Sequence, residues 1–264
     1  MEECPPPQPM PLLTHLRELR RRLVYSLLAI VAIFPVYTLF SRELYAFLVE
    51  PLVQAFPHPD QKRLIYTALP EAFMTYLKLG VFTSVMGAFP IISYQLWRFV
   101  APALYKQEKQ AFLPYLVLSP LLFVMGAALA FYGVMPLAFK FFVSFESLLD
   151  QSSLGLQLDA RISQYLSLVL GIMLAFGFCF QLPILLTLLA RAGLVTSAML
   201  TMKRRYAIVL VLIVAAVLTP PDVLSQLGLA IPLLLLYEIS IVWIKRIEKR
   251  KAASRAAQNA LVNA

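Results

Sequence analysis

Long apolar runs separated by short polar segments dominate the chain, and they predict membrane-spanning helices. The runs cover residues 23–40, 73–97, 112–132, 165–190, 206–218 and 227–244, and the third continues toward residue 145. Most of them suit an α-helix that crosses about 30 Å of hydrocarbon, which takes about 20 residues. The run 206–218 is short, because a helix of this length reaches only about 20 Å. The pattern predicts an all-α integral membrane protein, with residues 1–264 as a single six-span membrane domain.

Prolines interrupt most of these runs, at Pro35, Pro90, Pro120, Pro183 and Pro232. Each proline removes a backbone donor and bends its helix. Ordinary kinks of membrane helices are one interpretation. A bent, cupped bundle is the other, and the prolines alone leave both open.

Charge patterning sets the predicted orientation. Most of the 23 lysines and arginines fall in four clusters, at residues 17–22, 98–109, 191–205 and 245–255. The positive-inside rule places these clusters, both termini and a basic tail at 245–264 in the cytoplasm. The net charge of +9 therefore reports orientation, and nucleic-acid binding is not indicated.

Composition and missing motifs exclude several classes of protein. The chain is 60% hydrophobic and 14% charged, whereas soluble domains are about 45–50% apolar and about 25% charged. Cys4 and Cys179 lie too far apart in the topology to pair, and His15 and His58 lie in different loops, so no metal site is predicted. No phosphate-binding loop or zinc-protease motif occurs, so neither an enzyme nor a cofactor is expected. The first apolar run lacks a signal-peptidase exit, so a retained first helix is expected.

Four stretches of the chain resemble a known family. They are "HLRELRRRL" at 15–23, "YQLWRFVAPALYKQEK" at 94–109, "AFGFCFQLP" at 175–183 and "TPPDVLSQLGLAIPLLLLYE" at 219–238. They are similar to motifs of the TatC family, the polytopic receptor subunits of the twin-arginine protein translocase. Residues 48–51 and "TALPEAF" at 67–73 resemble the family's first external loop, which here contains Pro51 and Glu71.

The resemblance implies six kinked helices in a concave, glove-shaped bundle in the prokaryotic inner membrane. It also implies a receptor without catalytic chemistry that binds the twin-arginine signal peptides of folded cargo proteins at its cytoplasmic face. Single-span TatA-like and TatB-like partners would join it, in complexes with several copies of each chain. Export would then be driven by the proton-motive force.

Two acidic residues on the predicted cytoplasmic side are candidate ligands for a twin-arginine peptide. Guanidinium groups pair best with carboxylates, and acids near this membrane edge are scarce apart from Glu18 and Glu108. The resemblance assigns both to the signal-peptide site. The alternative for Glu18 is an ion pair along its own helix with Arg21 or Arg22, at i+3 or i+4. The alternative for Glu108 is a solvated loop charge.

Further residues join this site through the resemblance. Arg17 and Arg20 would position Glu18, although their ordinary role is orientation in the membrane. Supporting residues of the second cytoplasmic loop are Phe99, Pro102, Leu104 and Tyr105. Anchoring at the membrane interface is the alternative role of the aromatic residues among them.

Polar residues in or near the later spans are the remaining candidates. Gln181, beside Pro183, stands where much of the family has a glutamate, so a role that needs a charge there is in doubt. Docking of a partner and a purely structural hydrogen bond both remain open. Asp222 belongs to the outer "TPPD" motif and is also a common turn former. Glu238 should face protein or water, and Lys78 has Glu71 as a candidate partner.

A secondary transporter of a small solute is the alternative function. Kinked helices and a polar group such as Gln181 would then form a site in the middle of the membrane. Such transporters contain internal repeats, and the acid-bearing loop at 98–109 has no counterpart in the second half of the chain.

Overall fold

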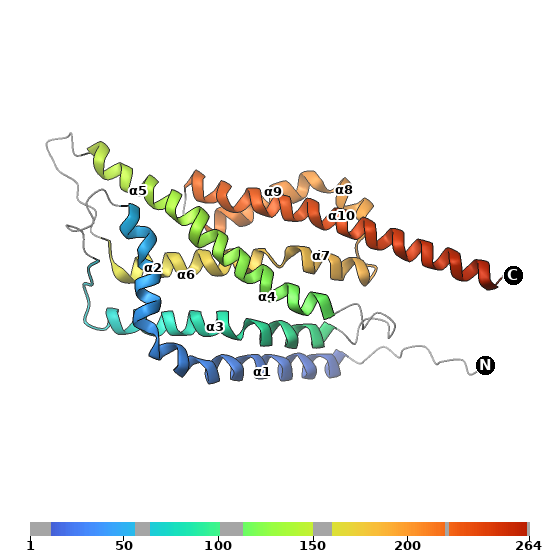
Figure 1. Ribbon diagram of the computed structural model, residues 1–264, viewed down its shortest axis with the longest axis horizontal. Helices are drawn as coiled ribbons and strands as arrows, with labels where there is room; N and C mark the ends of the chain where they lie inside the picture. The colour runs from blue at the N-terminus through green and yellow to red at the C-terminus, as the bar shows by residue number, and fades with distance from the viewer. Residues whose placement is uncertain (1–11, 56–63, 101–112, 150–159, 220–221, 263–264) are drawn as a thin grey trace.

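The structure is a computed structural model and describes residues 12–55, 64–100, 113–149, 160–219 and 222–262 (Figure 1). Its helices are α1 (Leu12–Leu39), α2 (Ser41–Ala55), α3 (Glu71–Val100), α4 (Leu113–Ala128), η4 (Leu129–Val134), α5 (Met135–Leu149), α6 (Ile162–Cys179), α7 (Leu182–Arg191), α8 (Ser197–Met202), α9 (Arg204–Leu218) and α10 (Val223–Val262). Within these ranges no β-strand occurs, and Ile65 and Arg161 form only an isolated bridge. The predicted all-α membrane fold is confirmed.

Five helical segments in the described ranges are long and apolar enough to cross a membrane. The sixth predicted span corresponds to α9, which has only 15 residues. At 1.5 Å per residue α9 reaches about 22 Å, so it needs flanking residues or a locally thinner bilayer. The structure therefore agrees with the short fifth run and does not by itself establish six full spans.

Two predicted runs contain breaks in the regular α-helix. The third is one helical path of α4, η4 and α5, in which the π-helical turn η4 ends just before Pro136. A wider turn accommodates a proline ring and its missing donor. The fourth run divides into α6 and α7 around Gln181, because Pro183 cannot bond to the carbonyl four residues earlier.

Helix α2 was not predicted. The segment around Pro51 was expected to be an external loop, whereas it is helical and lies across one end of the bundle (Figure 1). Its buried residues are Leu48, Pro51 and Leu52. This spacing gives one narrow apolar face, and the Tyr165 hydroxyl holds it by donating to the Leu48 carbonyl at 2.6 Å.

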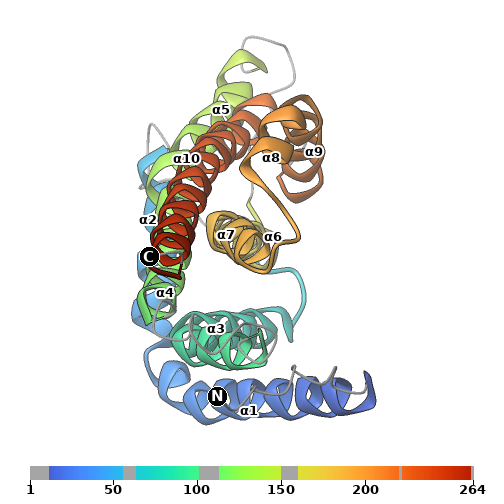
Figure 2. The ribbon, with the colours of Figure 1, turned by 90° about the vertical axis from the view of Figure 1, so that its right-hand side faces the viewer.

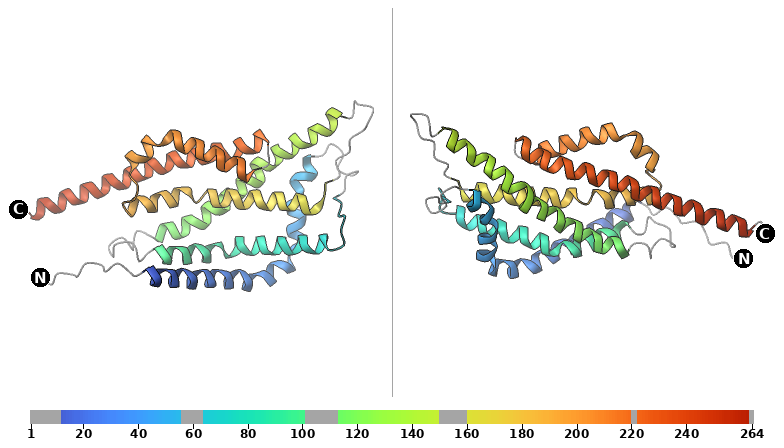
Figure 3. Two further views of the ribbon diagram at one scale, coloured as in Figure 1. Left: turned by 180° about the vertical axis from the view of Figure 1, so that it is seen from behind. Right: turned by 45° about the horizontal axis from the view of Figure 1, so that its top comes forward.

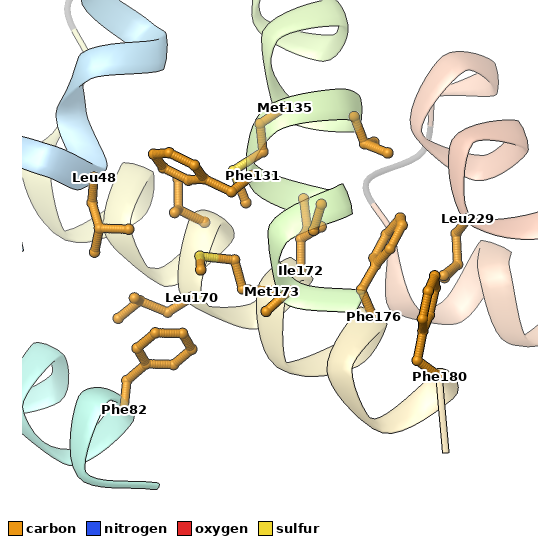
Figure 4. Packing of buried hydrophobic residues seen from close by; sticks show 14 of the residues in the cluster. Leu48, Phe82, Phe131, Met135, Leu170, Ile172, Met173, Phe176, Phe180 and Leu229 are labelled. Carbon is orange, nitrogen blue, oxygen red and sulfur yellow. The ribbon is translucent and has the colours of Figure 1, made fainter. Parts of the chain in front are cut away.

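Helix α6 forms the centre of the main core. Its side chains Leu170, Ile172, Met173 and Phe176 pack among residues of α2, α3, η4 and α10 (Figure 4). Helices α4 and α6 approach closely at Gly126, where an added Cβ would lie 2.6 Å from the Phe176 carbonyl oxygen. A larger residue at this position would push the two backbones apart.

Helix α1 is peripheral, and its main contact is with α3. Seen from one end, the helices follow an arc around α6 and α7, with α1 on its outside (Figure 2). Gly87 of α3 allows the close approach, because Tyr37 would lie 2.5 Å from an added Cβ. Helix α1 therefore depends mainly on α3 for its position.

The basic clusters define the two ends of the bundle. The start of α1, the end of α3, α8 and the C-terminal part of α10 share one end (Figures 1 and 3). By the positive-inside rule this is the cytoplasmic end. Helix α2 and residues 64–70 lie at the opposite, outer end.

Candidate functional site

Glu18 lies on the first turns of α1 at the cytoplasmic end. Its Oε1 atom is 3.0 Å from Nη2 of Arg22, one turn further on, and their side chains are 24% and 15% exposed. The Nη1 atom of Arg22 also donates to Oε1 of Gln95 on α3, at 3.2 Å. Of the two arginines that the sequence left open as partners, the structure selects Arg22. The contact also ties α1 to α3.

The carboxylate of Glu18 is only partly used. Within the described part of the chain, Oε1 accepts a hydrogen bond and Oε2 accepts none. An ionised carboxylate offers about four acceptor positions, so another donor can bind without displacing Arg22. The Nε atom of Arg22 is buried and has no hydrogen-bond partner among the described residues.

Other arginines surround Glu18 without touching it. Arg17 and Arg20 are exposed, and they line one surface of α1 together with Arg21 and Tyr25. Arg21 donates to the Tyr25 hydroxyl at 3.3 Å and lies over its ring. Arg22, rather than Arg17 or Arg20, is therefore the residue that positions Glu18.

The second half of the expected site lies outside the described residues. This applies to Pro102, Leu104, Tyr105 and Glu108. Phe99, at the end of α3, is half-buried.

The helix ends that flank this loop are firmly packed. Trp97 of α3 is buried with its ring 5.6 Å from that of Tyr115 on α4. The Arg191 guanidinium, from α7, lies 5.1 Å from the Tyr115 ring centre. Three helices, α3, α4 and α7, thus converge at these side chains.

Gln181 lies at the break between α6 and α7, where both its amide nitrogen and its amide oxygen are hydrogen-bonded. Its Nε2 atom donates to the Ser119 carbonyl at 2.9 Å, and its Oε1 atom accepts from the Ser119 hydroxyl at 2.7 Å. The Ser119 hydroxyl is also 3.0 Å from that of Ser93. These bonds link α3, α4 and the α6–α7 break, as expected for a structural glutamine beside Pro183.

At the outer end, Glu71 fastens the start of α3 to α6. Its carboxylate accepts from the Thr67 amide at 2.7 Å and from the Ser163 hydroxyl at 2.5 Å. Lys78 reaches Ser167 instead of Glu71, so the suggested pair of Lys78 with Glu71 is wrong.

Asp222 caps the start of α10 by accepting from the Ser225 amide at 2.6 Å. Aspartate is a favoured residue at this position, because its side chain satisfies a free amide of the first helical turn. Asp222 is buried, with 8% of its surface exposed. It therefore starts a helix rather than only shaping a turn.

The comparisons with known proteins agree with this architecture. Residues 14–232 match the family described as Sec-independent protein translocase protein (TatC). The chain belongs to the TatC family. The TatC protein of Magnetococcus marinus is 44% identical over 96% of this chain and 90% of its own length. That of Escherichia coli K12 is 39% identical over 88% of this chain and 86% of its own length.

A crystal structure of the twin-arginine translocase receptor TatC has the same fold. It is 39% identical and covers 88% of this chain and 98% of its own, with a TM-score of 0.73. A TatC crystal structure in the detergent DDM gives a TM-score of 0.75. This chain is therefore a multi-pass component of the Tat protein translocase in the inner membrane, and it is not an enzyme.

Sequence reasoning missed a group of contacts between α8 and α10. The Glu248 carboxylate accepts from the amide and hydroxyl of Ser197, and the Tyr237 hydroxyl donates to the Leu200 carbonyl at 2.8 Å. We call these contacts the α8–α10 clasp. Beside the clasp, Glu238 pairs with Arg204 of the same chain at 2.7 Å. Glu238 therefore faces another part of the protein, as its position in a span required. Only this last pairing had a signal in the sequence.

Proposed function

We propose that the cytoplasmic end of α1 is the receptor site for twin-arginine signal peptides, with Glu18 as the ligand of one arginine. The half-used carboxylate of Glu18 carries this proposal. Arg22 demonstrates that the carboxylate accepts a guanidinium at 3.0 Å, and the Oε2 atom, which has no partner among the described residues, can accept a second. Glu108 is the proposed ligand of the other arginine, supported by its place in the family motif.

The energetics favour sharing of the carboxylate over displacement of Arg22. Displacement would leave the Arg22 guanidinium, whose side chain is only 15% exposed, without its carboxylate partner, and an unpaired charge away from water is costly. An incoming arginine that uses Oε2 avoids this cost. The exposed Arg17 and Arg20 repel a basic ligand, so attraction must act at short range, where water is partly excluded.

Recruitment of single-span partners is the second part of the proposal. Helix α9 buries only Val211 and Ala215 and exposes a large apolar face. Its exposed residues include Ile208, Val209, Leu210, Leu212, Ile213 and Val217. A TatA-like or TatB-like helix can pack on this face and also compensate for the short length of α9.

The direct test is binding of a fluorescent signal peptide to the purified full-length chain in detergent. Arg-Arg and Lys-Lys peptides are compared on wild type, Glu18→Gln and Glu108→Gln. We expect Arg-Arg to bind more tightly than Lys-Lys, and each substitution to weaken binding about tenfold to a hundredfold, since hydrogen bonds to charged groups contribute about 1.5–3 kcal/mol.

Glu43→Gln is the matched control, because it removes one exposed acid from α2 at the outer end. It should leave the affinity unchanged. Equal binding of both peptides, unaffected by Glu18→Gln and Glu108→Gln, would refute the receptor site and return Glu18 to the role of an ion pair.

A further inference from the structure

The cytoplasmic part of α10 has two opposite faces. Along the first face lie Tyr237, Ile241, Ile244 and Glu248, at spacings of four, three and four. Residues at such spacings share one side of a helix. Tyr237, Ile241 and Ile244 are buried in a cluster with Leu200 of α8, and Glu248 bonds to Ser197. This face therefore points toward α8.

The second face carries exposed residues at the same periodicity. It consists of Leu235, Ile239, Val242, Arg246 and Lys249, each exposed. We call it the outer stripe of α10, where outer means facing away from α8 and does not refer to the outer end of the bundle. Ile239 lies about 200° around the helix from Tyr237, because each residue turns the helix by about 100°. The outer stripe thus faces away from α8.

The outer stripe changes character within one turn. Up to Val242 its residues are apolar and suited to lipid chains, and from Arg246 onward they are cationic. One turn corresponds to about 5.4 Å along the axis. Lys245 and Arg250 flank the cationic part, and Trp243, 49% exposed, lies at the junction. Tryptophan is enriched at the level of lipid headgroups.

No acidic side chain offsets these cations in the described part of this region. Between residues 223 and 250 the acids are Glu238 and Glu248. Glu238 is paired with Arg204, and Glu248 is held by Ser197. The α8–α10 clasp also fixes the rotation of α10, so its cations remain in line with its lipid-facing side chains.

We propose that the cationic part of the outer stripe binds the phosphate groups of anionic phospholipids in the inner leaflet. Apolar residues on the same line place the lipid chains, and Arg246 and Lys249 receive the headgroup. Guanidinium and ammonium groups both bind phosphate strongly. A lipid is the occupant because a soluble anion would make no use of the apolar continuation. The site is independent of the signal-peptide site on α1.

Trp243 provides a direct reporter of this site. The chain has two tryptophans, and Trp97 is buried, so Trp97→Phe leaves Trp243 as the only tryptophan. The protein is reconstituted in phosphatidylcholine vesicles, and fluorescence quenching by brominated phosphatidylglycerol and brominated phosphatidylcholine is compared at equal mole fractions. We expect stronger quenching by brominated phosphatidylglycerol. Trp243→Phe, which retains Trp97, should remove the difference.

Neutralisation of the stripe tests the assignment. The double variant Arg246→Gln/Lys249→Gln should reduce the preference for phosphatidylglycerol by up to about fivefold per cation. The matched control is Arg42→Gln/Lys140→Gln, which removes the same charge from exposed positions outside α10 and should retain the preference.

Three outcomes would overturn the proposal. The first is equal quenching of the Trp97→Phe protein by the two brominated lipids. The second is an equal loss of the phosphatidylglycerol preference in the control variant. The third is displacement of phosphatidylglycerol from the stripe by inorganic phosphate but not by chloride of the same ionic strength. The last outcome would assign the stripe to a soluble anion.

Discussion

Glu18 on α1 and Glu248 on α10 lie at the same end of the molecule, but their carboxylates are used differently. Glu248 accepts hydrogen bonds at both oxygens from Ser197. Glu18 accepts at one oxygen, from Arg22, and its Oε2 atom is unused in the described part of the chain. Glu248 holds α8 against α10, whereas Glu18 retains capacity for a ligand.

The packing around Glu248 and Glu18 also differs. Glu248 adjoins a buried cluster that includes Leu200, Ile241 and Ile244. Glu18 lies on a peripheral helix whose main support is α3. An acid that accepts at both oxygens in a packed junction stabilises the fold, and an acid that accepts at one oxygen on a peripheral helix is the better candidate for binding. Gln181, with both ends of its amide bound to Ser119, belongs with Glu248 in this respect.

The largest expected effect is a difference in peptide binding between variants of Glu18 and variants of Glu248. Glu18→Gln should weaken Arg-Arg peptide binding about tenfold to a hundredfold, because a charge-assisted bond is lost. Glu248→Gln should leave the affinity unchanged, since its carboxylate already serves Ser197. Fluorescence anisotropy of the labelled peptide measures both. An equal loss in the two variants would contradict the comparison.

Substitution of Glu248, which should not affect peptide binding, should instead lower the local stability of α8. Glu248→Ala leaves the Ser197 amide and hydroxyl without their acceptor, at a cost of about 1–3 kcal/mol. Amide hydrogen exchange across α8 should therefore accelerate at least several-fold. Glu238→Ala is the control, because its exposed pair with Arg204 contributes only about 0–1 kcal/mol. Unchanged exchange in α8 after Glu248→Ala would show that the clasp does not hold this helix.

Gln181→Leu tests whether an amide that is bonded through both its nitrogen and its oxygen is structural. The change removes two hydrogen bonds to Ser119, each with a net contribution of about 0.5–1.5 kcal/mol, so the thermal midpoint should fall. The exposed Gln164→Leu is the control and should have little effect. A stable Gln181→Leu protein that fails to assemble with partner subunits would instead support a docking role.

The smallest expected effect concerns Arg22. Arg22→Lys keeps the charge but cannot bridge Glu18 and Gln95 as a guanidinium does. Peptide affinity should fall about threefold to tenfold, as expected for one net hydrogen bond. Gln95→Leu should add little to Arg22→Lys in the double variant, because both act on one contact. Tighter binding by Arg22→Lys would show that the peptide displaces Arg22 from Glu18.

Much of the fold could be predicted from local sequence. The apolar runs marked the helical segments, Pro183 marked the break between α6 and α7, and residues 206–218 correctly indicated a short α9. Helix α2 was missed because its apolar face is narrow and its burial depends on contacts such as that with Tyr165, more than a hundred residues away.

Some features of the candidate site could likewise be predicted from the sequence, and others depended on the tertiary structure. The sequence by itself predicted the orientation in the membrane and showed the scarcity of acids near the basic edge, since both depend on composition and order along the chain. It allowed Glu18 to pair with Arg21 or Arg22 equally well, because i+3 and i+4 neighbours share a helix face. Only the tertiary structure decided for Arg22, because Gln95 on α3 supplies its second acceptor. Packing of distant helices likewise decided that both oxygens of Glu248 accept hydrogen bonds and that one oxygen of Glu18 has no partner among the described residues.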